Sequence, residues 1–558
     1  MAARPDGPVV AFDVSADGDE AGRPPGGEPR PPDRPEWWTR AAAWWRAASR
    51  RRRRAAVVAV GGALLAVAGA SVVGLQLAEQ VRADRLRAAP GGVVSLHGDL
   101  GEAWSTEASA VVAVLADGGL AFVDGEDVVV RDVADGTERW RADLGPEPEC
   151  GPRPRLSSGV EWTMTTDLVT CLHGTAGART VTVLDATGAQ VGERTLDPQP
   201  SPEAGVFVAP AAAGGLAVVE HEIDLPEPRT VENSSAPRVV AGIDPEGLGP
   251  ATLRVEDALT GAVRAESTAE RWPQSLQDCV VLTADAAGRP RPATTRIELK
   301  GVREPIATPS VVGYQMCQGG TGMATDGTPL GVTDVAGVAF ADLPSGELVE
   351  PFPGGGFVVS RRLAGAGLVA DDGAGPALAP DSRVQAPAAQ VGTADPAVIA
   401  TRGSTVVGLA SDGETRWETE LEGRARVLAR AAGVTVVSTD VSTDLVALDD
   451  GDGAERWRID MVHPAPDGRW VWPTSAVTDG ERVTVALMEG IDAGPTWPGS
   501  LLTVDLTSGD AHRTGLDLDG LPWVTAVDGH LLLHEVRQDG PFFRAWPEII
   551  SVRVLEQR

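Results

Sequence analysis

The hexapeptide "DGTERW" at Asp135–Trp140 recurs with small changes later in the chain. "DGETRW" occupies Asp412–Trp417 and "DGAERW" occupies Asp452–Trp457. Each copy follows a short apolar run, as in "VVVRDVADGTERW" at Val128–Trp140. An Asp-Gly pair supplies the positive φ angle of a tight turn, and the flanking runs have the length of strands. The pattern predicts a β-hairpin whose second strand carries tryptophan and turns its charged residues toward solvent.

Weaker copies of the same frame are scattered through the chain. They occupy Val181–Val191, Leu253–Arg264, Val338–Val349 and Leu501–His512. The glycines of the two clearest copies, Gly413 and Gly453, are 40 residues apart, which is the period of one four-stranded propeller blade. Other spacings are larger, so several blades must carry loop insertions. The repeat predicts an all-β protein built as a propeller.

The two ends of this region predict how the propeller closes. "EIISVRVLEQR" at Glu548–Arg558 is a strand with no tryptophan strand after it, and "GEAWSTE" at Gly101–Glu107 is a tryptophan strand with no hairpin before it. If the early strand completes the last blade, both exposed edges disappear. This arrangement favours eight blades. Seven remains an alternative, because residues 354–390 fit no repeat clearly.

An apolar strand, then "D-x-x-T/D-G", two or three polar residues and "W" resembles the pyrroloquinoline-quinone-like (PQQ-like) propeller repeat. The resemblance covers residues 93–558. This family includes quinoprotein dehydrogenases, outer-membrane assembly lipoproteins and membrane-anchored actinobacterial proteins. The resemblance implies a propeller whose repeat tryptophans pack between neighbouring blades. Those tryptophans are Trp104, Trp140, Trp417 and Trp457.

Residues 55–75 read "AAVVAVGGALLAVAGASVVGL" and contain no charge. A helix of this length spans about 30 Å, the thickness of a bilayer's hydrocarbon core. Arg50, Arg51, Arg52, Arg53 and Arg54 come directly before it, so the N-terminus is predicted in the cytoplasm and the rest of the chain outside. A cleaved signal peptide is the alternative, but the 54-residue leader exceeds an ordinary n-region. The sequence predicts a single-pass cell-membrane protein.

The segments around this span divide the rest of the chain. Residues 1–36 are rich in proline, glycine and acids, which predicts a disordered cytoplasmic tail. Residues 37–54 combine the arginines with Trp37, Trp38, Trp44 and Trp45. They are expected either to lie at the lipid headgroups or simply to extend the membrane helix. Residues 76–92 are predicted as a linker, and residues 93–558 as the extracytoplasmic propeller.

The formal net charge is -31. A strongly acidic domain repels phosphate backbones, so this charge argues against nucleic acid as a partner.

The chain has four cysteines, all in the predicted exterior domain. An even count in an oxidising compartment suggests two disulfides, for which three pairings are possible. We favour Cys150–Cys171 and Cys279–Cys317, because neighbour pairing closes short loops inside single blades. Catalytic members of the PQQ-like family use adjacent cysteines beside the quinone. None of these four are adjacent, so the resemblance implies the non-catalytic branch.

Other motifs give no catalytic, cofactor or metal residue. His530 and His534 share one face of a predicted strand, but four residues of strand separate them by about 13 Å, too far to bind one ion. "DDGDG" at Asp449–Gly453 resembles a calcium loop, yet it lacks the distal glutamate and coincides with a hairpin turn.

The sequence therefore predicts a non-enzymatic binding or scaffold module for an envelope protein, peptide or glycan, with no cofactor. The alternatives are a quinoprotein oxidoreductase, or a ligand sensor that works with a separate signalling partner.

Overall fold

The computed structural model describes residue 74 and residues 76–557 with several gaps, the longest at 270–305, 325–348 and 370–382. The chain divides into two compact units, Met1–Ala78 and Glu79–Arg558. The predicted tail, the Trp/Arg-rich segment and nearly all of the predicted span at 55–75 lie outside the described residues, as do Cys279 and Cys317. Among the residues described, no helix has both the length and the apolar character needed to cross a membrane.

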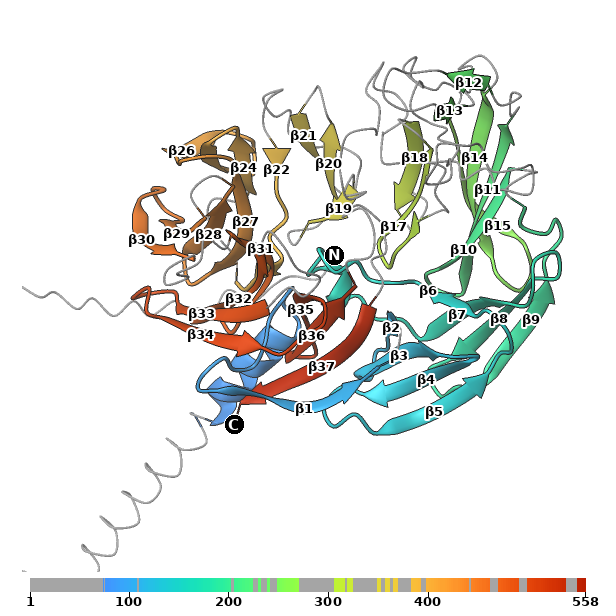
Figure 1. Ribbon diagram of the computed structural model, residues 1–558, viewed down its shortest axis with the longest axis horizontal. Helices are drawn as coiled ribbons and strands as arrows, with labels where there is room; N and C mark the ends of the chain where they lie inside the picture. Colours follow the sequence, from blue (N-terminus) through green and yellow to red (C-terminus); the bar gives the residue numbers. More distant parts are fainter. Residues whose placement is uncertain are drawn as a thin grey trace, which may run out of the picture. The chain divides into compact units, whose positions relative to one another are not determined.

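After a short helix the second unit is built of strands, which form mostly antiparallel sheets that follow one another in chain order (Figure 1). The first sheet contains β2 (Val111–Val114), β3 (Gly119–Asp124), β4 (Asp127–Asp132) and β5 (Glu138–Asp143). The second contains β6 (Glu149–Gly151), β7 (Leu168–His173), β8 (Thr180–Asp185) and β9 (Gln190–Thr195). The third contains β10 (Val206–Ala211), β11 (Gly215–Ile223), β14 (Leu248–Asp257) and β15 (Val263–Ala269). Between β11 and β14 the chain forms a separate hairpin of β12 (Arg229–Val231) and β13 (Arg238–Val240).

Two three-stranded sheets follow. One contains β16 (Ile306–Ala307), β17 (Val311–Met316) and β18 (Gly319–Ala324), and the other β19 (Val349–Pro351), β20 (Phe357–Arg361) and β21 (Gly365–Val369). The next four-stranded sheet contains β22 (Arg383–Val384), β24 (Val398–Arg402), β25 (Thr405–Leu409) and β26 (Thr415–Glu420).

A five-stranded sheet comes next, with β27 (Ala425–Ala431), β28 (Val434–Thr439), β29 (Asp444–Asp449) and β30 (Glu455–Asp460). Its fifth strand is β23 (Ala389–Gln390), which pairs with β27 in parallel. It is followed by a four-stranded sheet of β31 (Trp470–Thr478), β32 (Arg482–Gly490), β33 (Gly499–Asp505) and β34 (Ala511–Leu516).

The last sheet joins the two ends of the domain. It contains β35 (Leu521–Val527), β36 (His530–Val536), β37 (Ile549–Gln557) and β1 (Leu100–Thr106), in the order β1-β37-β36-β35. Residue Leu100 pairs with Gln557 and Thr106 with Val552, so β1 lies beside β37 (Figure 1). The predicted closure, in which an early strand completes the final blade, is confirmed. We call this sheet the closing sheet.

Successive four-stranded meanders closed in this way are the blades of a β-propeller. Among the described residues there are seven sheets of four or more strands and two of three. Gaps interrupt the chain on both sides of the three-stranded sheets, so the predicted count of eight blades, or seven, stays a prediction.

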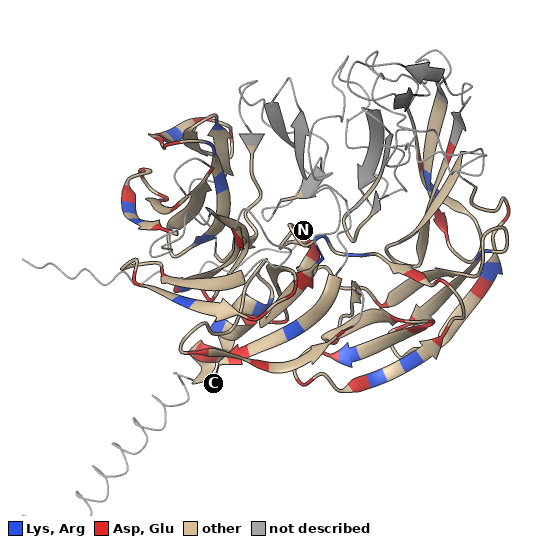
Figure 2. Ribbon diagram, viewed as in Figure 1, with Lys and Arg blue, Asp and Glu red and all other residues tan. Residues whose placement is uncertain are grey.

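In the first sheet burial falls from the innermost to the outermost strand. All four residues of β2 are buried, whereas β5, with the sequence ERWRAD, has three exposed residues and none that is buried. Inner strands pack on both faces and are therefore apolar throughout, while outer strands form the rim. The rim carries alternating charges (Figure 2). Arg141 of β5, for example, binds Asp127 at 2.7 Å and Glu138 at 3.0 Å. Charged side chains of this kind keep an exposed edge from pairing with another chain.

The segment before β1 is more ordered than the predicted linker over 76–92. Residues 76–87 are helical, and the unit boundary falls before Glu79. Leu86, Val93 and Leu96 are each no more than 2% exposed. These apolar side chains are buried against the sheets, so the segment belongs to the same unit as the propeller. We call residues 88–97 the strap.

Candidate functional site

The four predicted tryptophans lie on outermost strands and reach the next sheet. The indole Nε1 of Trp140 donates a hydrogen bond to the carbonyl of Ala186 at 2.8 Å, and Trp417 makes the same bond to Asp450 at 2.8 Å. Trp104 bonds the carbonyl of Val133 at 2.9 Å, and Trp457 that of Leu506 at 3.0 Å. Each acceptor directly follows the aspartate that ends the strand next to the outermost strand of its sheet. The tryptophans therefore form one repeated joint between neighbouring blades.

The turn glycine gives the indole its space. A Cβ atom at Gly453 would lie 2.5 Å from Cε3 of Trp417, and one at Gly136 would lie 2.7 Å from the ring of Trp104. Both glycines also have positive φ, +73° and +71°. The hexapeptides at 135–140 and 452–457 thus each serve two joints: the glycine receives the preceding tryptophan, and the tryptophan covers the glycine of the following turn.

The arginine of the hexapeptide does more than face solvent. Arg139 binds Asp132 at 2.7 Å, and Arg456 binds Asp449 at 2.5 Å. The hydrogen bond from Arg139 lowers the pKa of the Asp132 carboxyl, whose other oxygen accepts the backbone N–H of Ala134. The arginine therefore braces the turn from its second strand, which the expectation of a solvent-facing charged pair missed.

One joint is built with different residues. Gly192 occupies the tryptophan position of the second sheet, and a Cβ atom there would lie 3.0 Å from Leu259 of the third sheet. Arg194 then donates to the carbonyl of Ala258 at 2.9 Å, the acceptor that an indole would use. In this joint Leu259 fills the space of the indole ring and Arg194 makes its hydrogen bond. In the sequence the exchange is marked by Gly192, a glycine where the three hexapeptides have tryptophan.

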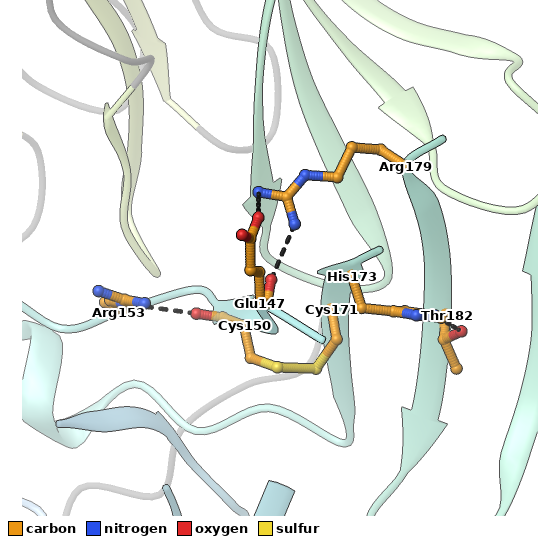
Figure 3. The surroundings of a disulfide bond; sticks show 7 residues. All are labelled: Glu147, Cys150, Arg153, Cys171, His173, Arg179 and Thr182. Carbon is orange, nitrogen blue, oxygen red and sulfur yellow. Dashed lines mark hydrogen bonds and ion pairs between the residues drawn. A yellow bond between two sulfur atoms is a disulfide. The ribbon is translucent and has the colours of Figure 1, made fainter. Parts of the chain in front are cut away.

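Cys150 and Cys171 form a disulfide, as the favoured pairing predicted (Figure 3). The two residues are direct register partners on β6 and β7, and both are buried. Arg153 donates to the carbonyl of Cys150 at 3.2 Å, and Arg179 holds the carbonyl of Glu147 at 2.8 Å (Figure 3). The disulfide therefore fixes the base of the loop that joins β6 to β7, residues 152–167.

A buried glutamate fixes the middle of this β6–β7 loop. Glu161 lies in a 3-10 turn (Glu161–Thr163) and is fully buried. Its carboxylate accepts the backbone N–H of Arg155 at 2.8 Å, the guanidinium of Arg155 at 2.8 Å and the hydroxyl of Ser310 at 2.7 Å. A carboxylate with these donors is a structural anchor, because a buried charge is stable only when it is paired and hydrogen-bonded.

The same loop contacts the closing sheet through aromatic rings. Trp162 lies against His534 with ring centroids 5.0 Å apart, and Trp523 donates its indole N–H to the carbonyl of Leu156 at 2.8 Å. At Gly159 the loop also meets the segment before β23, since a Cβ atom there would lie 1.9 Å from the carbonyl oxygen of Ala388. The loop thus ties the second sheet to three distant parts of the chain.

His534 is fully buried in β36, where its Nε2 lies 2.7 Å from the hydroxyl of Thr525. Burial lowers the pKa of His534 to about 3, so the ring is neutral at physiological pH. The neighbouring His530 binds Glu556 at 3.5 Å instead. Over the described ranges, no three His, Cys, Asp or Glu side chains are grouped so that they could hold a metal ion.

We expect acid to destabilise the protein through His534. The unfolded chain binds a proton near pH 6.5, while the folded chain binds it only near pH 3. Stability is therefore full above about pH 6.5 and falls with pH below that value, by at most about 1.4 kcal/mol per unit. Urea unfolding at pH 7.5 and pH 5 measures this. His534→Gln, which can still bond Thr525, should lose less between the two; equal losses would contradict the assignment.

The acidic turn Asp449–Gly453 uses its carboxylates within the hairpin. Asp449 accepts the N–H of Gly451 at 2.8 Å, and Asp452 accepts that of Ala454 at 2.9 Å. Asp450 is buried and pairs with Arg430 at 3.3 Å. These bonds engage the acidic residues with the turn's own backbone and, for Asp450, with β27.

Residues 354–513 match the model of a family described as outer membrane protein assembly factor BamB. No curated protein matches the chain. Among solved structures, BamB from Moraxella catarrhalis is similar at 15% identity over 82% of this chain and 100% of that chain, with a TM-score of 0.34. AztD from Citrobacter koseri is similar at 14% identity over 73% and 95%, with a TM-score of 0.24. The strand pairing described above is that of a β-propeller.

Proposed function

We propose that this chain is a membrane-anchored binding module. In this proposal residues 55–75 span the cytoplasmic membrane and hold the propeller outside, where it engages an envelope protein, peptide or glycan. The observation that carries the binding role is that buried ionisable groups form ion pairs with one another inside the propeller. Glu161 pairs with Arg155, Asp450 with Arg430, and Glu489 with Arg513 at 2.6 Å. Side chains held in this way stiffen a scaffold, and loops on a rigid scaffold are where binding residues concentrate.

Two further observations support parts of the proposal. The buried Cys150–Cys171 disulfide is typical of proteins that fold in an oxidising compartment, which supports the extracytoplasmic placement. The match of residues 354–513 to a family described as an assembly factor supports a protein as the ligand.

Crosslinking in intact cells tests the partner. A photoreactive group placed in the propeller should capture envelope proteins, identified by mass spectrometry, and capture should fail when residues 37–75 are replaced by a cytoplasmic solubility tag. A pair of reporters fused after Arg558 tests the topology. A reporter that works only outside the cytoplasm should be active, and one that works only in the cytoplasm should be inactive. Activity of the cytoplasmic reporter would overturn the topology.

Adding pyrroloquinoline quinone to the purified protein tests the oxidoreductase alternative. We expect no stoichiometric binding and no dye reduction with alcohol or sugar substrates. Stoichiometric binding with substrate-dependent dye reduction would replace the binding proposal with a quinoprotein enzyme.

A further inference from the structure

We propose that the strap is a peptide ligand bound in cis, and that the propeller surface beneath it is a peptide-binding groove. The groove is formed by three segments: Thr478–Glu481 between β31 and β32, Asp528–Gly529 between β35 and β36, and Ala388–Gln390 at β23. These segments belong to three different sheets. The strap crosses them before β1 begins, so every strand of the closing sheet is present without it.

Backbone hydrogen bonds hold the strap along its length. Val93 N–H donates to the carbonyl of Thr478 at 2.9 Å, and Thr478 N–H donates back to Gly91 at 2.9 Å. Val94 N–H donates to Gly529 at 2.9 Å, and Gln390 N–H donates to the carbonyl of Pro90 at 2.8 Å. The strap pairs as a parallel bridge with each of the two turns. An extended peptide that adds its backbone to exposed polar groups of a sheet protein is a known mode of peptide recognition.

Two side chains of the strap are buried in the apolar core. Val93 is 0% and Leu96 is 1% exposed, and both belong to one core cluster with residues of the last two sheets. The members of the cluster from those sheets include Val477, Ala486, Leu501, Val524, Ala526 and Leu531. Between these anchors, the Val94 side chain is 38% exposed. Side chains that enter a surface at spaced positions give a bound peptide its specificity, while its backbone hydrogen bonds give affinity.

Glycines set the close approach at the other end of the strap. A Cβ atom at Gly91 would lie 2.6 Å from the carbonyl oxygen of Ala388, and its φ is +61°. A Cβ atom at Gly92 would lie 2.2 Å from the carbonyl oxygen of Leu86. Gly92 thus lies against the end of the preceding helix, whereas Gly91 is the glycine that the groove itself requires. The groove therefore recognises a Gly-x-Val-x-x-Leu segment in which Gly91 turns the chain.

Charged groups fix the register of the bound segment. Asp479 has a fully buried side chain, and its Oδ2 accepts the N–H of Leu96 at 2.9 Å while Oδ1 accepts Arg482 N–H at 2.7 Å. Arg82, one helix turn before Leu86, binds Glu481 at 3.1 Å and the carbonyl of Asp479 at 3.2 Å. The β31–β32 turn thus supplies acceptors both to Leu96 of the strap and to Arg82 of the helix before the strap.

Cutting the chain between the strap and β1 tests this inference. A protease recognition sequence is inserted between Gly98 and Asp99 in the full chain, which is then cut to completion in detergent solution and passed over a sizing column. We expect the fragment that ends at the cut to elute with the propeller. The result holds whether or not residues 55–75 span a membrane, so it is separable from the proposed function.

Matched substitutions in the strap give the specificity. Val93→Asp buries a charge and should release at least ten-fold more fragment, and Gly91→Val should also release it. Val94→Asp places the same charge at the exposed neighbour and should leave the complex intact. Residues 99–558 are identical in all variants, and circular dichroism of the propeller fragment checks its fold. Separation of the fragments in the otherwise unaltered cut chain, or equal release by Val93→Asp and Val94→Asp, would overturn the groove.

Discussion

Trp417→Ala should lower the free energy of unfolding by about 3–5 kcal/mol, the usual cost of removing a buried tryptophan. The ring is 6% exposed, it lies over Gly453, and its N–H bonds the carbonyl of Asp450. The substitution leaves a cavity between two sheets and removes that donor together. Urea unfolding followed by circular dichroism measures the loss.

Two variants separate the contributions to this effect. Trp417→Phe keeps most of the apolar area but removes the donor, so it should cost less than alanine by the packing contribution and still lose about 1 kcal/mol for the unpaired carbonyl. Trp472→Ala is the control, because that ring is 42% exposed in β31; it should change stability by less than about 0.5 kcal/mol. If Trp472→Ala and Trp417→Ala lower the free energy of unfolding equally, the effect does not come from the contact between blades.

Val554→Asp should destabilise the protein by about 4 kcal/mol or more, because it buries a charge with no partner. Val554 is 0% exposed in the middle of β37, between Trp104 of β1 and Leu532 of β36. The substitution therefore acts on the strand that joins both ends of the propeller. Thermal unfolding should show a large fall in Tm, measured against Glu556→Gln.

Glu556 lies two residues along the same strand, and its side chain is 48% exposed, so its replacement should be nearly neutral. Equal melting of Val554→Asp and the unaltered protein would show that closure contributes little to stability. An equal fall in Tm for both variants would show that any change in this strand destabilises the protein, whether or not the position is buried.

The repeat was readable from sequence because its chemistry is local. The Asp-Gly turn and the tryptophan four residues after the glycine lie within one hairpin, so residues 135–140 predict both the turn and the outward strand. The closing strand was predictable for a related reason: Gly101–Glu107 and Glu548–Arg558 each lack the half that the other supplies. Both features could be predicted from the repeat alone, without knowledge of contacts between distant parts of the chain.

The β6–β7 loop and the strap were not predicted because their partners are distant in sequence. Glu161 bonds Ser310, 149 residues away, and Leu96 bonds Asp479, 383 residues away. The loop is rich in proline, serine and threonine, and the strap contains "APGGVV", which are compositions typical of surface segments. Burial of Glu161 and Val93 depends on turns from several sheets meeting at one place, which no local pattern records.

The strap also determines how the propeller would respond to mechanical force. Tension applied at Glu79 would pass through the Arg82 ion pair and the backbone bonds of residues 90–96, and so would be divided among turns of three sheets. These bonds share the load, and β1 would bear tension only after they fail. Without the strap the same pull would act directly on the first pair of the β1–β37 ladder and could unzip it one bond at a time. The strap would therefore carry the applied force before the closing sheet does.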